Sequence, residues 1–425
     1  MTKRRSPGEG GCWSYKIKAG ERFHARGPVK MPDGTIRMVS QKGFVTKKSG
    51  LEWLHGQQAA GSKGEFIEPS RQQFGDYGRE VIEGLCVEPQ TRASYLKNWR
   101  NHVEPYPLAN IPLATLTGVK LTSHYRQLET SGRKDHRAGE GLSARTVRYI
   151  HTIIHGVLKQ AVDDGLLARN PAKMAKPPTA KQATAPEMHP WTAAELAAFL
   201  AWSVKRGHSG SGRDQSALLW HCLWTALAMT GMRRGEALAL RWRDLDTTNT
   251  TLAIRRSAGI VRTHGEGAVI TEGTTKSGKV RVVDLDKATL VMLVAYRRQR
   301  GLIALQLARD DALIFGDLEG QFLQPEHVSR QFGRDVARCG STVVKGGTPV
   351  PVIRLHDLRH THATLLLLAG KPPHVVSQRL GHTSPVITMT IYAHVMPGNQ
   401  KDAADTFARL LDEAGDDAAE GGSAR

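Results

Sequence analysis

The 425-residue sequence has little cysteine, few aromatic residues and no long apolar run. Its four cysteines (Cys12, Cys86, Cys222 and Cys339) lie far apart without a CxxC pair, which predicts reduced thiols, a cytoplasmic protein and no structural zinc site. No run of about eighteen apolar residues predicts a transmembrane helix, and the N-terminus MTKRRSPGEGG lacks the apolar segment of a signal peptide. An aromatic content of 6% argues against binding of single strands by base stacking.

Negative charge is also scarce. The chain carries 59 Lys and Arg against 40 Asp and Glu, which gives a formal net charge of +19 and a pI of about 9.9. Residues 1–64 alone hold 13 Lys and Arg against 4 Asp and Glu, a net charge of +9. Such an imbalance favours a nucleic-acid partner. A bias toward solubility would give the same composition, and the N-terminal segment could be a solvated basic extension.

The order of the patterns predicts a multidomain, mainly α-helical chain. Residues 1–64 show short strand patterns followed by a helix, which predicts a small β-sheet plus a helix. Residues 65–175 predict a bundle of four or five helices, and residues 176–190, within a stretch rich in Pro, Ala and Lys, predict a linker. Residues 191–411 predict a larger mixed α/β domain, and the acidic, Gly/Ala-rich residues 412–425 predict a disordered tail.

Several helix ends can be predicted from capping residues. Thr46 is suited to cap the helix of the first domain, and Thr192 with Glu195 forms a capping-box pattern. The clearest helix lies in LSARTVRYIHTIIHGVLKQAVDDGLLARNP, where Ser143 is suited to cap the start and Gly165 to end the helix. Its apolar residues recur at three- and four-residue steps and predict one buried face, formed by Val147, Ile150, Ile154, Val157 and Ala161.

Two segments of the last domain place basic residues where they can form a cationic site. SALLWHCLWTALAMTGMRRGEALALRW predicts a buried helix, a glycine turn and a second helix, with Arg233 just after the turn and Glu236 placed to hold it. GAVITEGTTKSGKVRVVDLD predicts a hairpin with Lys276 at its tip. Each has an ordinary alternative, because Arg233 and Glu236 could be a surface ion pair and Lys276 a solvated turn lysine.

Three further segments follow. LHDLRH places His356 and Arg359 three residues apart on one helical face, LGHTSP places His382 near a glycine-hinged helix start, and IYAH holds Tyr392. His382 could instead cap a helix, and Tyr392 could be an ordinary half-buried tyrosine. His356 and His360 could share a metal ion, but no HExxH glutamate and no third ligand at suggestive spacing is present, so no metal is expected.

Taken together and in this order, TGMRRGEALALRW, TKSGKVRVVDL, LHDLRHTHAT, LGHTSP and IYAH resemble the tyrosine recombinase (phage integrase) family. The resemblance covers residues 65–411 well, and the basic residues 12–60 are similar to the arm-type DNA-binding domain that many integrases carry. One departure is TTKSGK, where many members have Pro-Lys-Thr, so Lys279 is a rival of Lys276.

The resemblance implies a helical core-binding domain, a mixed α/β catalytic domain, and an active site that cuts DNA through a 3′-phosphotyrosine with no cofactor, ATP or metal. Its implied members are Arg233 and Arg359 as the phosphate clamp, Tyr392 as nucleophile, His356 as base, Lys276 as acid for the leaving 5′-oxygen, and His382 as hydrogen-bond partner of the phosphate. The helix that begins at His356 would present its cations to one phosphate, and the apolar run ATLLLLAG would anchor this helix in the core. His360 and His362 would only support this face of the helix.

The resemblance implies double-stranded DNA at core and arm sites as partner, together with a homotetramer on that DNA, a host DNA-bending protein and an excision factor. It implies that these act in the cytoplasm at the nucleoid. The terminal segment KDAADTFARLLDEAG carries Phe407, Leu410 and Leu411 on one apolar face, which must be buried in its own protomer or in a neighbour's. Two alternatives remain: a type IB topoisomerase-like enzyme that only nicks and reseals, and a non-catalytic DNA-binding protein on this scaffold.

The basic N-terminal segment generates the first prediction. Deleting residues 1–64 is expected to weaken binding to accessory sites, and to leave cleavage of a short core site intact. Binding through this segment should fall steeply with salt, because phosphate contacts release counterions. Filter binding and cleavage assays on the deleted and full-length chains measure both effects. Loss of core cleavage with every other contact kept would contradict the assignment.

Overall fold

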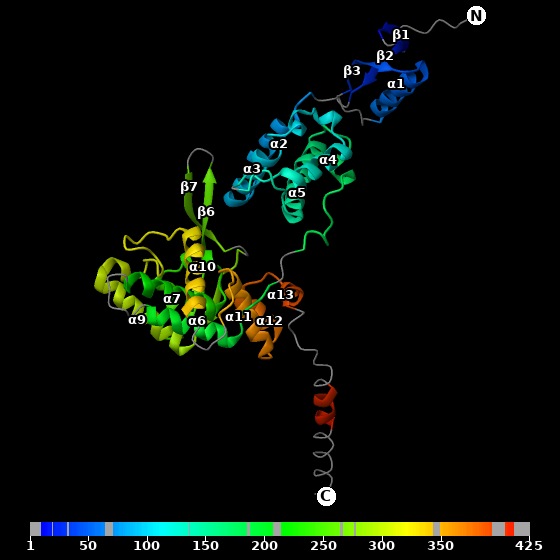
Figure 1. Cartoon of the computed structure of the whole chain (residues 1–425). Coiled ribbons are helices and arrows are strands. Elements are labelled where there is room, and N and C mark those ends of the chain that lie inside the picture. The colour runs from blue at the N-terminus through cyan, green and yellow to red at the C-terminus, as the bar shows by residue number, and fades with distance from the viewer. Residues whose placement is uncertain are drawn as a thin grey trace, which may run out of the picture. The chain divides into compact units, whose positions relative to one another are not determined.

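The computed structural model describes residues 10–18, 20–31, 34–63, 71–135, 137–184, 188–206, 214–263, 267–275, 278–342, 349–392 and 404–411. The chain divides into two compact units, Met1–Ala185 and Pro186–Arg425 (Figure 1). The predicted fold class is confirmed, since the structure is mostly helical with a three-stranded N-terminal sheet and a mixed C-terminal region. The finer domain boundaries stay predictions.

The N-terminal sheet consists of β1 (Gly11–Ile17), β2 (Gly20–Lys30) and β3 (Ile36–Phe44), which are antiparallel and lie in that order. Helix α1 (Lys47–Ser62) begins where predicted, because the hydroxyl of Thr46 accepts a hydrogen bond from the Ser49 backbone N–H at 3.1 Å. Gly50 inside this helix allows close packing, since a Cβ there would lie 2.5 Å from the Cys12 sulfur. The core that results is small and centres on Cys12, Ala25 and Leu54.

The helical part of the first unit contains α2 (Phe74–Glu83), α3 (Pro89–His102), α4 (Gly118–Ser131) and α5 (Ala144–Asp163), with 3₁₀ turns at Pro107–Asn110, Leu113–Thr115 and Pro171–Met174. Ser143 caps α5 by accepting from the Thr146 backbone N–H at 3.3 Å. The five residues of the predicted apolar face are all buried in the shared core of these helices.

The segment after the bundle has no helix or strand over residues 175–184. It is nevertheless attached to the bundle, since Arg148 donates to the Pro178 carbonyl at 2.6 Å and the Lys176 backbone N–H donates to Thr122 at 2.9 Å. The first part of the predicted linker therefore runs along α4 and α5.

The second unit is mainly helical. Its helices are α6 (Ala193–Arg206), α7 (Asp214–Thr230), α8 (Arg234–Leu238), α9 (Lys287–Ile303), α10 (Pro325–Thr342), α11 (Asp357–Leu368), α12 (Pro373–Leu380) and α13 (Pro385–Tyr392), with 3₁₀ turns at Trp242–Asp244 and Leu305–Ala308 and a further helical segment over residues 404–411. The predicted capping box of α6 is present, because Thr192 and Glu195 each bind the other's backbone N–H. Trp191, Phe199, Trp224 and Phe332 form the centre of the main core.

The strands correct one prediction. The hairpin expected within residues 267–286 does not form, because β7 (Gly267–Thr274) pairs along its whole length with β6 (Arg256–Thr263). Strand β8 (Arg281–Asp284) instead pairs with β5 (Thr251–Ile254), which also pairs with β4 (Leu245–Asp246). Alternation of apolar and polar residues predicts where strands lie, but it does not predict which strands pair.

Burial explains this choice. Val283 of β8 is buried opposite the buried Leu252, so β8 completes the sheet that faces the core. Strand β7 is exposed on nearly every residue, and Figure 1 shows the β6–β7 ribbon extending away from the helices of this unit. Lys276, expected at the hairpin tip, lies outside the described residues.

A second, smaller core joins α11, α12 and α13. It consists of Ala363, Leu367, Val376, Leu380 and Tyr392. The predicted anchor ATLLLLAG is only partly buried, since Ala363 and Leu367 lie in this core while Leu368 is exposed. Helix α11 has another attachment, because its buried Thr361 accepts a hydrogen bond from the Trp191 backbone N–H at 3.0 Å.

Among the described residues, no helix is both long and apolar enough to cross a membrane. The four cysteines are free thiols, and of these only Cys86 is exposed.

Candidate active site

The glycine turn between α7 and α8 brings the C-terminal helices close to Arg233. Gly231 has a φ of +62°, in the left-handed region that favours glycine. A Cβ at this position would lie 2.7 Å from the His362 ring and 2.8 Å from the Leu380 side chain. The sequence therefore needs glycine here for two reasons, and the turn lies directly against α11 and α12.

Glu236 holds Arg233 in place. The carboxylate accepts from the Arg233 guanidinium at 2.9 Å and from the Arg233 backbone N–H at 2.8 Å. Its side chain is 1% exposed, so the pair is not the surface ion pair that was the ordinary alternative. About a quarter of the Arg233 side chain stays accessible (26%), which leaves room for a ligand.

Arg281 of β8 binds the other side of the same carboxylate. Its two terminal nitrogens donate to Glu236 at 2.6 and 3.1 Å. Burial would raise the pKa of Glu236, but Arg281 and Arg233 outweigh it and hold the pKa below its usual value. Sequence analysis did not single out Arg281; the only signal was a basic residue at the start of a predicted strand.

Arg359 is more deeply buried than Arg233. Its side chain is in α11, is 4% exposed, and donates from Nη1 to the Gly231 carbonyl at 2.8 Å. Its Nη2 is buried with no hydrogen-bond partner among the described residues. Burial and the nearby Arg233 lower the pKa of Arg359 to about 9, which still leaves it cationic at neutral pH. A buried, unpaired guanidinium nitrogen is costly, and an anion placed against it would remove that cost.

Tyr392 closes the site from the end of α13. Its side chain is 2% exposed, and burial raises its pKa to about 12 although the charge of Arg359 opposes the shift. The phenol oxygen is 2.7 Å from Nδ1 of His360. Tyr392 is therefore not the ordinary half-buried tyrosine of the alternative interpretation, but a buried phenol in a specific contact. It cannot ionise at neutral pH unless another group takes its proton.

Three histidines lie near this tyrosine and the arginines: His356 just before α11, His360 within α11, and His382 in the loop after α12. The His356 and His360 rings are perpendicular, with centroids 5.1 Å apart. One edge of His356 is open to solvent, yet the protein around the rest of its ring, His360 and Arg359 lower its pKa to about 4. His382 binds Thr388 at 2.8 Å, and burial together with Arg359 and Arg233 lowers its pKa to about 4.

His360 is the contact that sequence analysis missed. It was assigned only a supporting position, although its spacing of four residues from His356 placed both on one helical face. His362 does act as a support: its Nδ1–H donates to the Ala228 carbonyl at 2.8 Å, and its Nε2 accepts from Arg379 at 3.0 Å. Those two bonds fix its tautomer and link α11 to α7 and α12.

The structure brings together five of the six predicted site residues: Arg233, His356, Arg359, His382 and Tyr392. The sixth, Lys276, lies outside the described residues, so its place stays a prediction. Its rival Lys279 is described and exposed, and its carbonyl accepts from the Thr275 hydroxyl at 2.8 Å.

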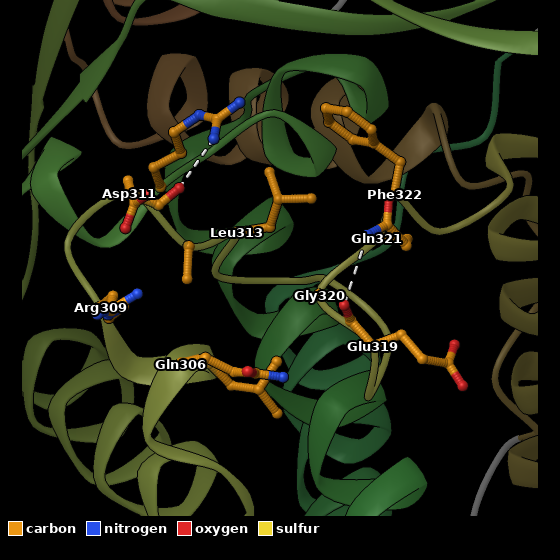
Figure 2. Close-up of a pocket in the computed structure, with 11 residues that line it drawn as sticks. Gln306, Arg309, Asp311, Leu313, Glu319, Gly320, Gln321 and Phe322 are labelled. Carbon is orange, nitrogen blue, oxygen red and sulfur yellow. Dashed lines mark hydrogen bonds between the residues drawn. The ribbon is translucent and has the colours of Figure 1, made fainter.

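The second unit also contains a pocket that the predicted site residues do not line. It has a volume of about 450 Å³ and is lined by Arg241, Gln306, Arg309, Asp311 and Glu319, among others (Figure 2). Its charges are mixed, as Figure 2 shows for Arg309, Asp311 and Glu319. No group of three or more His, Cys, Asp or Glu suited to hold a metal ion occurs within the described ranges.

The chain is similar in sequence and in fold to known recombinases and integrases. Residues 204–398, which include all six predicted site residues, match the model of the phage integrase family. The chain is similar to a tyrosine recombinase XerC-like protein of Caldanaerobacter subterraneus subsp. tengcongensis, with 24% identity over 349 residues covering 78% of this chain and 81% of that protein. It is also similar to the ICEBs1 integrase of Bacillus subtilis, with 29% identity over 288 residues covering 67% and 70%.

Solved structures share the fold. The Tn1549 transposon integrase, in complex with transposon right end DNA, aligns with a TM-score of 0.60 and 20% identity over 80% of this chain and 99% of that one. The XerH site-specific recombinase in a post-cleavage complex aligns with a TM-score of 0.52 and 19% identity, covering 81% and 98%.

The buried carboxylate between two arginines generates the second prediction. Glu236→Gln is expected to cost about 3–5 kcal/mol in the free energy of unfolding, because it removes one partner of a buried ion pair. Since the folded-state pKa of Glu236 lies below its ordinary value of 4.5, its contribution is present above that pH and is lost as the pH falls through the folded-state pKa.

Urea unfolding of both proteins at several pH values measures these effects, with the exposed Glu319→Gln as control. The Glu236→Gln protein should lose less stability than wild type on acidification. Equal unfolding midpoints for Glu236→Gln and wild type at neutral pH would contradict a structural role for this carboxylate.

Proposed function

We propose that this chain is a tyrosine recombinase of the phage integrase family and that it works as a site-specific recombinase. It cuts and rejoins DNA through a 3′-phosphotyrosine, and it thereby integrates or excises a mobile element. The observation that carries this proposal is the buried Nη2 of Arg359, which has no hydrogen-bond partner within the described ranges and lies in a site that also holds Arg233 and Tyr392.

The two arginines suit one phosphodiester. A phosphodiester carries a full negative charge, and its transition state gathers more charge on the non-bridging oxygens. Arg359 is fixed by the Gly231 carbonyl and Arg233 by Glu236, so both guanidinium groups are oriented before DNA arrives. Preorganised donors of this kind stabilise developing charge without having to move during the reaction. His382 would hydrogen-bond the same phosphate, since it lies near enough to Arg359 and Arg233 for their charges to lower its pKa.

The reaction needs a nucleophile and two proton transfers. The Tyr392 oxygen would attack phosphorus, and the leaving 5′-oxygen would take a proton from Lys276, with Lys279 as the rival donor. For the proton of the Tyr392 hydroxyl the chain offers two acceptors, His356 from the resemblance and His360 from its contact. Storing the bond as a phosphotyrosine ester explains why no ATP is required.

The other parts of the chain would bind and arrange the DNA. The basic N-terminal sheet and α1 would contact arm sites, and the helical bundle with the catalytic domain would enclose a core site, joined by the linker of residues 176–190. The proposed partners are double-stranded DNA, further copies of this chain as a tetramer, and a host DNA-bending protein and an excision factor. Such a complex would work at the nucleoid.

Mutation can distinguish the role of the Tyr392 nucleophile from that of the phosphate clamp formed by Arg233 and Arg359. Tyr392→Phe removes one oxygen, so core-DNA binding should stay near wild type while no covalent adduct forms. Arg359→Ala should slow adduct formation about 10²–10³-fold, because losing one preorganised donor costs roughly 3–4 kcal/mol. Denaturing gels with end-labelled DNA measure the adduct, and the tryptic peptide that contains residue 392 should carry the nucleotide.

These outcomes also separate the alternatives. Adduct formation excludes a non-catalytic binder, and recombinant product excludes an enzyme that only nicks and reseals. Covalent DNA trapped by Tyr392→Phe would mean that another residue attacks the phosphate.

The terminal helical segment generates a prediction about assembly. Phe407, Leu410 and Leu411 are each more than half exposed, so the apolar face is not covered by the described residues of its own chain. Changing Leu410 and Leu411 to Ala should therefore reduce synapsis of two core sites more than binding of one site, as measured by native gel shifts. Leu302→Ala, at an exposed leucine of α9, serves as control. Equal loss of both activities would contradict assembly through this face.

A further inference from the structure

The hydrogen bond of the Tyr392 hydroxyl points to a residue outside the set that the family resemblance implies. Nδ1 of His360 lies 2.7 Å from the phenol oxygen, and the two ring centroids are 5.8 Å apart. Among the described residues, His360 is the hydrogen-bond partner of the Tyr392 hydroxyl. His356, one helical turn earlier, is exposed and lies against the His360 ring. The nearest proton acceptor for the nucleophile is therefore His360.

We propose that His360 is a catalytic residue, which takes the proton of the Tyr392 hydroxyl during attack and returns it on rejoining. This assignment rests on the proposed function, and it leaves the phosphate clamp and the leaving-group acid unchanged. His356, which is exposed and lies near Arg359 and Arg233, is then free to act on the phosphate.

The step balances as follows. The Tyr392 oxygen forms a bond to phosphorus while its proton moves to Nδ1 of His360, which becomes an imidazolium. The bond from phosphorus to the 5′-oxygen breaks, and that oxygen takes a proton from the leaving-group acid. On rejoining, a 5′-hydroxyl attacks the phosphotyrosine and returns its proton to the leaving-group acid, and the imidazolium protonates the departing tyrosine oxygen. No net proton, electron or co-reactant is consumed over the two steps.

The surroundings of His360 keep it neutral and ready to accept. Burial lowers its pKa below the usual 6.5, Arg359 and Arg354 lower it further, and the carboxylate of Asp357 opposes them. The other titratable groups that face it are His356 on its own helix, His382 after α12, and Tyr392 on α13. A neutral imidazole whose Nδ1 carries no proton accepts the tyrosine hydrogen, and its charged form cannot.

The same arrangement sets the pH dependence. The active form of the base is neutral, so cleavage should stay high above the ordinary histidine pKa. It should fall only as the pH drops through the lowered pKa of His360. Removing the imidazole at position 360 should remove this acid limb of the pH profile.

The test begins by selecting core duplexes from a randomised pool with the Tyr392→Phe protein. A nick beside the cleavage position then makes a substrate that traps the adduct in a single turnover. Adduct formation is timed from pH about 5 to about 9 for wild type, His360→Asn, His356→Asn and the exposed control His374→Asn. Asparagine is chosen because its amide oxygen can occupy the place of Nδ1 and accept a hydrogen bond, but cannot take a proton.

A second substrate carries sulfur in place of the leaving 5′-oxygen. A thiolate leaves without protonation, so this substrate bypasses the leaving-group acid and isolates activation of the nucleophile. We expect His360→Asn to bind core DNA like wild type, to form adduct about 10²–10⁴-fold more slowly on both substrates, and to lack the acid limb. His374→Asn should behave as wild type.

Three results would overturn the assignment. These are a wild-type rate for His360→Asn, a defect of His360→Asn that the sulfur substrate relieves, or loss of the acid limb in His356→Asn but not in His360→Asn. Failure of wild type to form any adduct on the selected duplexes would instead overturn the proposed function, and this assignment with it.

A measurement without DNA tests the contact itself. In imidazole ¹⁵N spectra of the free chain, Tyr392→Phe should shift the Nδ1 resonance of His360 and leave that of His374 unchanged. An unchanged His360 resonance would show that the hydrogen bond does not form in solution, and would also overturn the proposal.

Discussion

The site depends on a buried guanidinium that is only half satisfied. Arg359 uses one nitrogen to bind the Gly231 carbonyl and leaves Nη2 buried without a partner among the described residues. Folding a chain around an unpaired charged donor costs free energy, which the protein must recover elsewhere. In the proposed mechanism a bound phosphate recovers it, which would link the fold of the second unit to its function.

Three features hold that guanidinium where a phosphate can reach it. Gly231 permits the close approach of α11 and α12, because any side chain there would collide with His362 and Leu380. Glu236 compensates the charges of Arg233 and Arg281 without binding Arg359, and so orients one arginine while leaving the other to the ligand. Tyr392 is buried beside them, where its raised pKa keeps the hydroxyl protonated until a base acts.

Much of this could be predicted from sequence, and the limits have physical causes. Capping residues such as Ser143 and Thr192 were predicted correctly because their bonds are local. The apolar face of α5 and the glycine turn before Arg233 were also correct, since each is encoded within one or two turns of chain. The predicted partner of β8 was wrong, because strand pairing depends on burial contributed by distant segments. The contacts of Arg281 and His360 were missed for the same reason: their partners lie 45 and 32 residues away in sequence.

The most direct measurement of the central claim is the structure of the Tyr392→Phe protein bound to a core duplex. One backbone phosphate should lie with its non-bridging oxygens within hydrogen-bond distance of Arg359 Nη2 and of the Arg233 guanidinium, next to the ring at position 392. A bound duplex whose phosphates all lie away from Arg359, with Nη2 still unpartnered, would contradict the account.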